Sequence, residues 1–224
     1  MKRIVYAAVA TTACIAAAPT DEPRAMLVRA AFSTTQKAEA LGLVNRALGS
    51  LTTILSRTPG NREALLQQGI GLGYRGQLTR SPGDARRARD ILLDLTKRNP
   101  NDPEAAIALG GWHLSVIGDV GGFIGSTVLG ADRKAGLAAL DRAVRLGGNQ
   151  AFYPAYAGLI RIRLDPKDKQ AAALLDRASG AAVSTELDRI TQASARRVAA
   201  QLKSGDAKGA SRLAKQLLPF GRIT

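Results

Sequence analysis

The two residue types most often used for metal binding and acid–base catalysis are almost missing from this chain. Its 224 residues include one histidine, His113, and one cysteine, Cys14. A zinc site needs several Cys or His ligands, and a catalytic histidine needs a nucleophile or a carboxylate within reach. Asp119 follows His113 by six residues, which places it on another side of a helix. We therefore predict no catalytic residue, no metal site and no cofactor, and we expect His113 to lie partly buried near a groove.

One glycine-rich motif has the spacing of a nucleotide-binding loop. Gly71-Leu72-Gly73-Tyr74-Arg75-Gly76 matches Gly-x-Gly-x-x-Gly. In a dinucleotide site these glycines follow a strand and open a helix whose N–H groups face the pyrophosphate. Here the motif falls within or at the end of an expected helix, and no strand is predicted. The sequence therefore favours close helix packing followed by a loop.

The chain is strongly basic. Lys and Arg number 32 against 18 Asp and Glu, a formal net charge of +14. Such a charge attracts nucleic acid, anionic lipid headgroups or acidic polymers. Aromatic residues for base stacking make up only 4% of the chain, which argues against nucleic acid and leaves an anionic envelope surface as a candidate partner. The cations cluster on expected helices as Arg86, Arg87, Arg89, Lys97 and Arg98, then Arg161 and Arg163, then Arg196, Arg197, Lys203, Lys208, Arg212 and Lys215.

The N-terminus has the pattern of an export signal. Lys2 and Arg3 precede an apolar run from residue 4 to 18 that ends in small residues, before a polar stretch. This run is shorter than the ~20 residues of a membrane-spanning helix. We predict a signal peptide at 1–18, a flexible linker at 19–34 and a periplasmic protein of a Gram-negative bacterium with no transmembrane span in the mature chain. A buried N-terminal helix, or lipid anchoring through Cys14, is the alternative.

A spacing pattern recurs five times along the rest of the chain. A small residue is followed after four residues by a mostly aliphatic one, after three more by a small or aliphatic one, and after five by a turn residue or breaker. The first three positions share one face of a helix. The copies are Ala47, Leu51, Ile54, Pro59; Ala88, Leu92, Leu95, Pro100; Gly136, Leu140, Ala143, Gly148; Ala171, Leu175, Ala178, Val183; and Ala207, Ser211, Ala214, Pro219.

A weaker pattern precedes the middle three copies. Gly69, Gly110 and Gly158 occupy equivalent places in three expected helices. Glycine in a helix interior costs about 1 kcal/mol relative to alanine, so a packing reason is expected. We predict that each glycine lets two helix axes approach closely.

Together these patterns resemble the tetratricopeptide repeat (TPR) family over residues 35–221. Segments 98–105 and 58–64 are similar to the family's inter-repeat turn, although the copies are 35–48 residues apart where the family has about 34. The resemblance implies an all-α, antiparallel helix-pair solenoid with a right-handed superhelix. Asp84, Asp102 and Asp206 are expected N-caps. We expect about nine helices, near 35–57, 62–77, 84–98, 103–118, 133–146, 151–163, 168–179, 185–203 and 206–218.

The resemblance also suggests where a partner or ligand would bind. The family's concave-face positions correspond here to Leu66, Ile70, Tyr74, Ile107, Gly111, Leu114, Phe152, Ala155, Leu159 and Ile162, a mostly apolar set. A Gly-rich insert at 119–131 carries four further apolar side chains, Phe123, Ile124, Val128 and Leu129. We expect this insert to fold back over the groove; the alternative is an exposed hairpin that touches a partner or a membrane.

The expected function is a non-catalytic scaffold or adaptor for an unidentified protein partner in the bacterial cell envelope. A second hypothesis is a periplasmic ligand-handling accessory of a transport system. The T component of TRAP transporters is similar in being a secreted, TPR-like helical protein with an apolar cavity. An enclosed cavity in place of an open groove would favour this second hypothesis.

Overall fold

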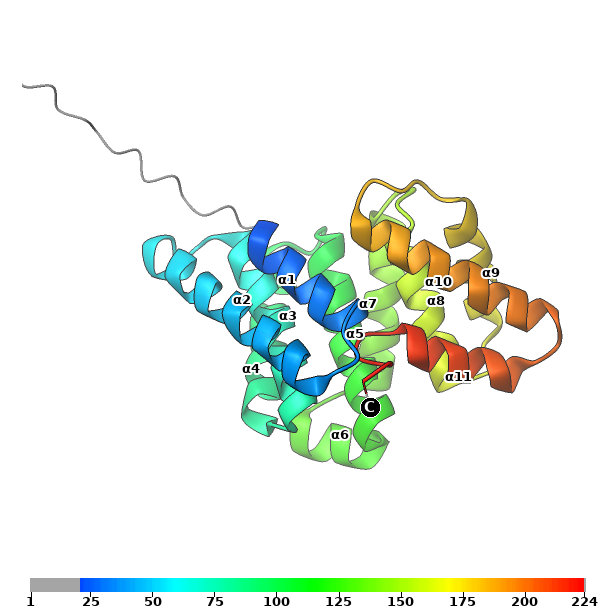
Figure 1. Ribbon diagram of the computed structural model, residues 1–224, viewed down its shortest axis with the longest axis horizontal. Coiled ribbons are helices and arrows are strands. Elements are labelled where there is room, and N and C mark those ends of the chain that lie inside the picture. Colours follow the sequence, from blue (N-terminus) through cyan, green and yellow to red (C-terminus); the bar gives the residue numbers. More distant parts are fainter. Residues whose placement is uncertain (1–20, 224) are drawn as a thin grey trace, which may run out of the picture.

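The protein is all-α over the residues that its computed structural model describes, 21–223 (Figure 1). The expected signal peptide, its cleavage position and Cys14 lie outside these residues. Eleven helices form within the described part: α1 (Asp21–Phe32), α2 (Lys37–Arg57), α3 (Arg62–Thr79), α4 (Pro82–Arg98), α5 (Pro103–Val120), α6 (Gly122–Leu129), α7 (Arg133–Leu146), α8 (Phe152–Leu164), α9 (Lys169–Gly180), α10 (Glu186–Lys203) and α11 (Ala207–Leu217).

All nine expected helices form, with ends within two residues of the prediction, and two more were not expected. The flexible linker predicted at 19–34 is wrong for most of its length, because residues 21–32 form α1. Leu27, Ala30 and Ala31 lie on one face of α1 and are buried in the core. The second addition, α6, forms within the insert.

Side-chain caps define most helix starts. The side chains of Asp102 and Asp206 accept hydrogen bonds from the backbone N–H groups of the following turn, as predicted. Asp84 does not cap α4. Ser81 does so instead, with Pro82 at the first helical position, while Asp84 receives two hydrogen bonds from Arg75. These bonds and the positive charge of Arg75 lower the pKa of the Asp84 carboxyl below its ordinary value.

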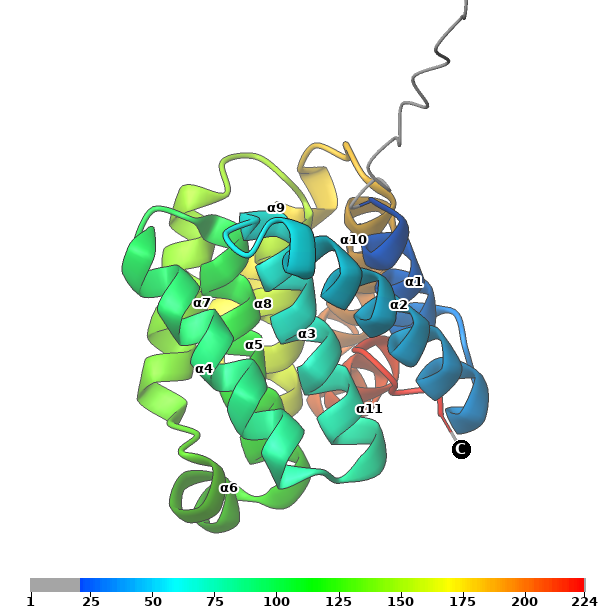
Figure 2. The same ribbon diagram turned by 90° about the vertical axis from the view of Figure 1, so that its left-hand side faces the viewer.

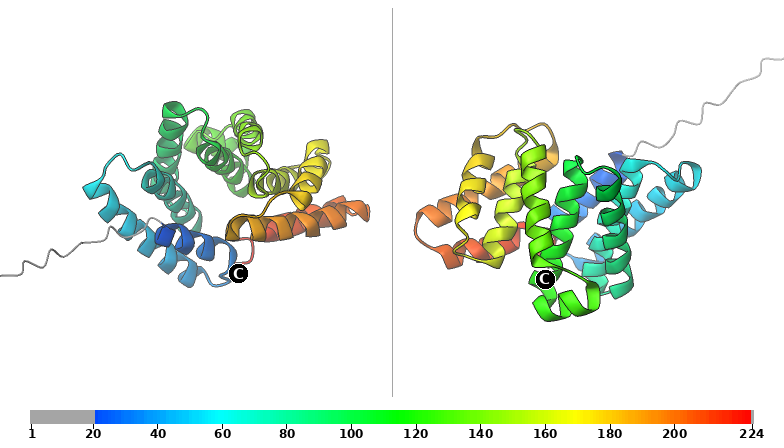
Figure 3. Two further views of the ribbon diagram at one scale, coloured as in Figure 1. Left: turned by 90° about the horizontal axis from the view of Figure 1, so that it is seen from above. Right: turned by 180° about the vertical axis from the view of Figure 1, so that it is seen from behind.

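Most helices pack against a neighbour in sequence, α1 with α2, α3 with α4, α8 with α9 and α10 with α11, whereas α5 pairs with α7 across the short α6. The pairs follow a curved course that brings the last helices back beside the first (Figures 2 and 3). At this junction the Phe220 backbone N–H donates to the Ala31 carbonyl over 2.9 Å, and the Phe220 ring is buried with α1 side chains.

The three predicted glycine contacts are confirmed. A Cβ added at Gly69 would lie 3.0 Å from a methyl of Leu92, one at Gly110 2.8 Å from Leu140, and one at Gly158 within 3.0 Å of Leu175. Each leucine is the second position of the spacing pattern on the partner helix. The same glycine–leucine contact therefore joins α3 to α4, α5 to α7 and α8 to α9.

The core consists of two clusters of buried side chains that meet at α5. One cluster lies among α1–α4 and includes Trp112 of α5, whereas the other lies among α7–α11 and includes Ile107 and Leu114 of α5. α5 thus packs into both clusters. Because it has neighbours on both sides, its packing is sensitive to added volume.

We predict that Gly110→Ala destabilises the protein by roughly 1–3 kcal/mol, even though alanine is the better helix former. The added methyl group would approach the Gly136 carbonyl oxygen to 2.9 Å and the Leu140 backbone nitrogen to 3.0 Å, so the α5 and α7 backbones must separate. Urea unfolding measures the difference.

The matched control is Gly49→Ala on α2, where the added methyl group meets nothing within 4 Å. This substitution should raise stability by up to about 1 kcal/mol. Equal effects at Gly49 and Gly110 would contradict the packing role of Gly110.

Candidate functional site

The structure encloses most of the predicted groove residues between helices. Leu66, Ile107, Leu114, Ala155, Leu159 and Ile162 are at most 3% exposed. Gly111 is buried, and a Cβ there would lie 2.7 Å from the Tyr156 hydroxyl. Ile70, Tyr74 and Phe152 are half-buried. A partner on the surface would therefore reach at most a few of these ten side chains.

The C-terminal segment, not the insert, packs against the expected groove. The Phe220 ring meets the Tyr74 ring edge to face, with centroids 4.9 Å apart. Burial raises the pKa of the Tyr74 hydroxyl far above its ordinary value, and raises that of Tyr156 to about 12. Burial thus favours the neutral form of both hydroxyl groups.

An ion-pair network joins the first turns of α1, α3 and α5. Arg24 pairs with Glu63 and Glu104, each at 2.8 Å. Arg62 pairs with Glu104 at 2.8 Å, and its Nε and Nη2 both donate to the buried Asp102, over 2.8 Å from Nε. Burial alone would raise the pKa of Glu104, but the hydrogen bonds and charges of Arg24 and Arg62 outweigh it and lower that pKa.

A cleft of about 360 Å³ opens beside this network. Arg62, Asp102 and Glu104 line it together with Tyr153 of α8. Asp188 of α10 accepts a hydrogen bond from the Phe152 backbone N–H over 2.9 Å, so the first turns of α8 and α10 also lie together. Because each carboxylate here already has a cationic or N–H partner, the cleft fits a structural junction better than a reaction centre.

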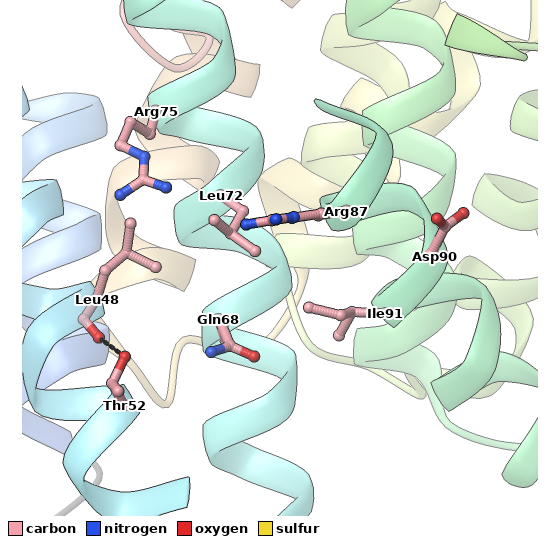
Figure 4. A pocket seen from close by; sticks show the side chains of 8 residues that line it. All are labelled: Leu48, Thr52, Gln68, Leu72, Arg75, Arg87, Asp90 and Ile91. Atoms are coloured by element: carbon pink, nitrogen blue, oxygen red, sulfur yellow. Dashed lines mark hydrogen bonds between the residues drawn. The ribbon is translucent and has the colours of Figure 1, made fainter. Parts of the chain in front are cut away.

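A second cleft, of about 420 Å³, lies between α2, α3 and α4 (Figure 4). Leu48, Leu72 and Ile91 give it apolar lining, and Arg75 and Arg87 are among its charged lining residues. Arg75 is held by Asp84 at 2.7 Å. The cleft thus mixes apolar and charged walls, and it places no nucleophile beside a base.

His113 and the glycine motif have structural explanations. The His113 ring is buried, and its Nδ1 accepts a hydrogen bond over 3.0 Å from the backbone N–H of Asp132, the residue that follows the insert. Burial lowers the pKa of His113, which favours the neutral ring that this bond requires. Residues 71–76 lie in the interior of α3, where added side-chain atoms at Gly71 and Gly76 would meet Leu48 and Ala85.

Two of the expected surface cations are internal. Arg161 is 5% exposed and pairs with Asp141 and Asp168, and Arg163 pairs with Asp119. Within the described residues, no group of three or more His, Cys, Asp or Glu side chains is placed to hold a metal ion.

The insert does not fold back over the groove. It forms α6 at one end of the molecule, beside α4 and α5 (Figure 1). Phe123 is 80% exposed, Ile124 52%, Val128 51% and the preceding Val120 42%, whereas Leu129 is buried. The expectation of a groove-filling insert is therefore wrong, because α6 is joined to α7 by only three residues, which keep it at the end of α5. The insert is exposed, as in the alternative of an exposed hairpin, but it forms a helix and not a hairpin. We call residues 120–129 the apolar tip.

The chain has no match among the known proteins compared with it. No family model matches, and no curated protein or solved structure does. No helix among the described residues is long and apolar enough to cross a membrane.

Sequence reasoning missed the ion-pair network and found the apolar tip only as an alternative. Arg24 lay in a segment expected to be a linker. The sequence does hint at the partners of Arg24, because Glu63 and Glu104 occupy equivalent positions after two similar turns.

We predict that Glu104→Gln lowers the free energy of unfolding by roughly 1–2 kcal/mol near neutral pH. The folded-state pKa of Glu104 is depressed, so its contribution is complete above the unfolded value of about 4.3 and is lost as pH falls through the folded value. The wild type should therefore lose stability between about pH 5 and pH 3 more steeply than the variant, as measured by urea unfolding.

Glu186→Gln is the control, since Glu186 forms only an exposed pair with Arg189. It should change stability by less than about 0.5 kcal/mol. Parallel pH profiles for the wild type and Glu104→Gln would show that the network does not stabilise the fold.

Proposed function

We propose that this protein is a TPR-like helix-pair solenoid that serves as a non-catalytic docking module in the bacterial cell envelope, with α6 as its docking surface. The observation that carries the proposal is the cluster of apolar side chains exposed on α6 and just before it. Apolar surface on one contiguous site is the usual mark of an interaction surface.

The apolar exposure is concentrated in one place. Seven large apolar side chains are well exposed in the described part of the chain, and four of them lie between Val120 and Val128. The other three, Leu93, Leu146 and Val183, are single residues on separate elements. Isolated exposed apolar residues are ordinary, whereas a group of four at one tip calls for an explanation.

The rest of the molecule supports the role of a rigid platform. The repeated glycine–leucine contacts hold α3–α4, α5–α7 and α8–α9 at close range, as expected of a solenoid. α6 is attached to this platform at both ends, through α5 and α7, and its own Leu129 is buried. A docking surface fixed in this way loses little conformational entropy on binding.

The ligand-handling alternative has less support. An accessory that carries an apolar ligand needs an enclosed apolar chamber, whereas both clefts described above are open and lined in part by charged side chains. Docking through α6 is therefore the function we favour.

Site-specific photo-crosslinking tests the proposal. A photoreactive phenylalanine analogue at Phe123, in the protein exported by the producing bacterium, should give adducts with an envelope component, identified by mass spectrometry. The same analogue at Val183, which is also an exposed apolar position, should give few. Equal or absent adducts from both positions would contradict docking through α6.

A further inference from the structure

We propose that α6 docks onto a bilayer surface that carries anionic phospholipid headgroups. This inference rests on the proposed function, because it names the partner of the same surface. Two features of the tip carry it, the apolar helix itself and the cations around its base.

The helix is apolar on almost every side. Its sequence is Gly-Phe-Ile-Gly-Ser-Thr-Val-Leu, and no charged residue occurs from 120 to 131. The row of Gly125 and Leu129 faces the protein and is buried, whereas Phe123 and the row of Ile124 and Val128 face outwards. The two hydroxyl side chains, Ser126 and Thr127, donate to the Phe123 carbonyl and so are satisfied within the helix. The tip thus carries no polar group that needs a protein partner.

Cations surround the base of the helix. Arg89 donates from Nη1 to the Leu129 carbonyl over 2.7 Å, and Arg86 donates from Nη1 to the Val128 carbonyl over 3.4 Å. Arg133 and Lys134 follow in the exposed first turn of α7. Among the described residues, none of Arg86, Arg133 and Lys134 has an ion-pair partner.

The nearby carboxylates are already engaged. Asp119 pairs with Arg163, Asp84 with Arg75, and Asp90 with Arg89. The fourth, Asp132, caps α7, accepts from the Ala135 N–H over 2.7 Å and keeps its negative charge. Arg86, Arg133 and Lys134 outnumber this one carboxylate, so the base of the tip has an excess of positive charge.

This combination fits an anionic bilayer better than it fits a second copy of the chain. A tip of eight residues is roughly 12 Å long, and interfacial helices bury their apolar face about 5–10 Å into the headgroup and acyl boundary. Cations at the base would then meet the phosphates. Stable attachment to a membrane commonly needs both an apolar element and basic residues. Two copies joined tip to tip would bring two cationic rims together, which opposes dimerisation.

Co-sedimentation with lipid vesicles tests the proposal. All eleven helices lie within residues 21–217, so the chain from Pro19 onwards carries the described fold without the apolar N-terminal run. At about 0.15 M salt this chain should bind vesicles of phosphatidylcholine with phosphatidylglycerol at least roughly tenfold more tightly than vesicles of phosphatidylcholine alone. Salt near 1 M should remove most of the difference.

Two variants separate the two features. Phe123→Ser/Ile124→Ser should weaken binding to the anionic vesicles by roughly tenfold or more. Arg133→Glu/Lys134→Glu should do the same and abolish the preference for anionic lipid. The controls are Val183→Ser, an exposed apolar residue elsewhere, and Arg46→Glu/Arg57→Glu on α2, which changes the net charge equally on another face (Figure 2). Thermal unfolding checks that every variant keeps its fold.

Three results would overturn the proposal: no binding to either vesicle, equal binding by wild type and both tip variants, or a concentration-dependent dimer that only the tip variants lose. If vesicles fail to bind while crosslinking at Phe123 still captures a specific envelope protein, docking through α6 stands and the lipid partner is wrong. If both experiments fail, the proposed function fails with it.

Discussion

The fold depends on how closely its helices approach one another. Aromatic residues make up only 4% of the chain, so large rings cannot fill wide gaps between helices. Glycine at the crossing point removes the side chain that would keep two axes apart, and a leucine from the partner helix fills the space. The same solution occurs in three helix pairs. A larger residue at Gly110 would push the backbones of α5 and α7 apart, because the atoms nearest to its Cβ include the α7 main chain.

A second constraint acts at the start of the helices. The first turns of α1, α3 and α5 share one ion-pair network, and Asp188 ties α10 to α8. These partly buried charges stabilise the fold only as a complete set, since a carboxylate left without its arginine keeps the cost of desolvation. The network therefore fixes how far neighbouring helices are offset along their axes, while the glycine contacts fix the distance between those axes. Together they make a platform on which α6 is held in a defined place.

Much of the architecture is predictable from sequence because short-range sequence patterns determine where the helices begin and end. Prolines, Asp caps and the spacing of small and aliphatic residues place nine helices to within two residues of their ends.

Three features depend on contacts between distant parts of the chain and are not predictable from local patterns. α1 is short, and its buried face becomes apparent only when α2, α3 and Phe220 supply its neighbours. Tyr74 packs against Phe220 because the C-terminal segment lies beside the first described helices, a contact that no local pattern encodes. Composition alone does not decide whether the apolar insert faces the core or the solvent; its short connection to α7 does.

The contact between Phe220 and Ala31 changes how such a molecule would come apart. Helix pairs that touch only their sequence neighbours behave as a linear stack, and each end can fray without disturbing the other. Here the last described residues lie on the first helix, so neither end can open alone. The N-terminal and C-terminal thirds should gain and lose amide protection together in hydrogen exchange. Partial unfolding would then begin in the middle of the chain or at α6, and a tag fused close to Phe220 would weaken α1 as much as α11.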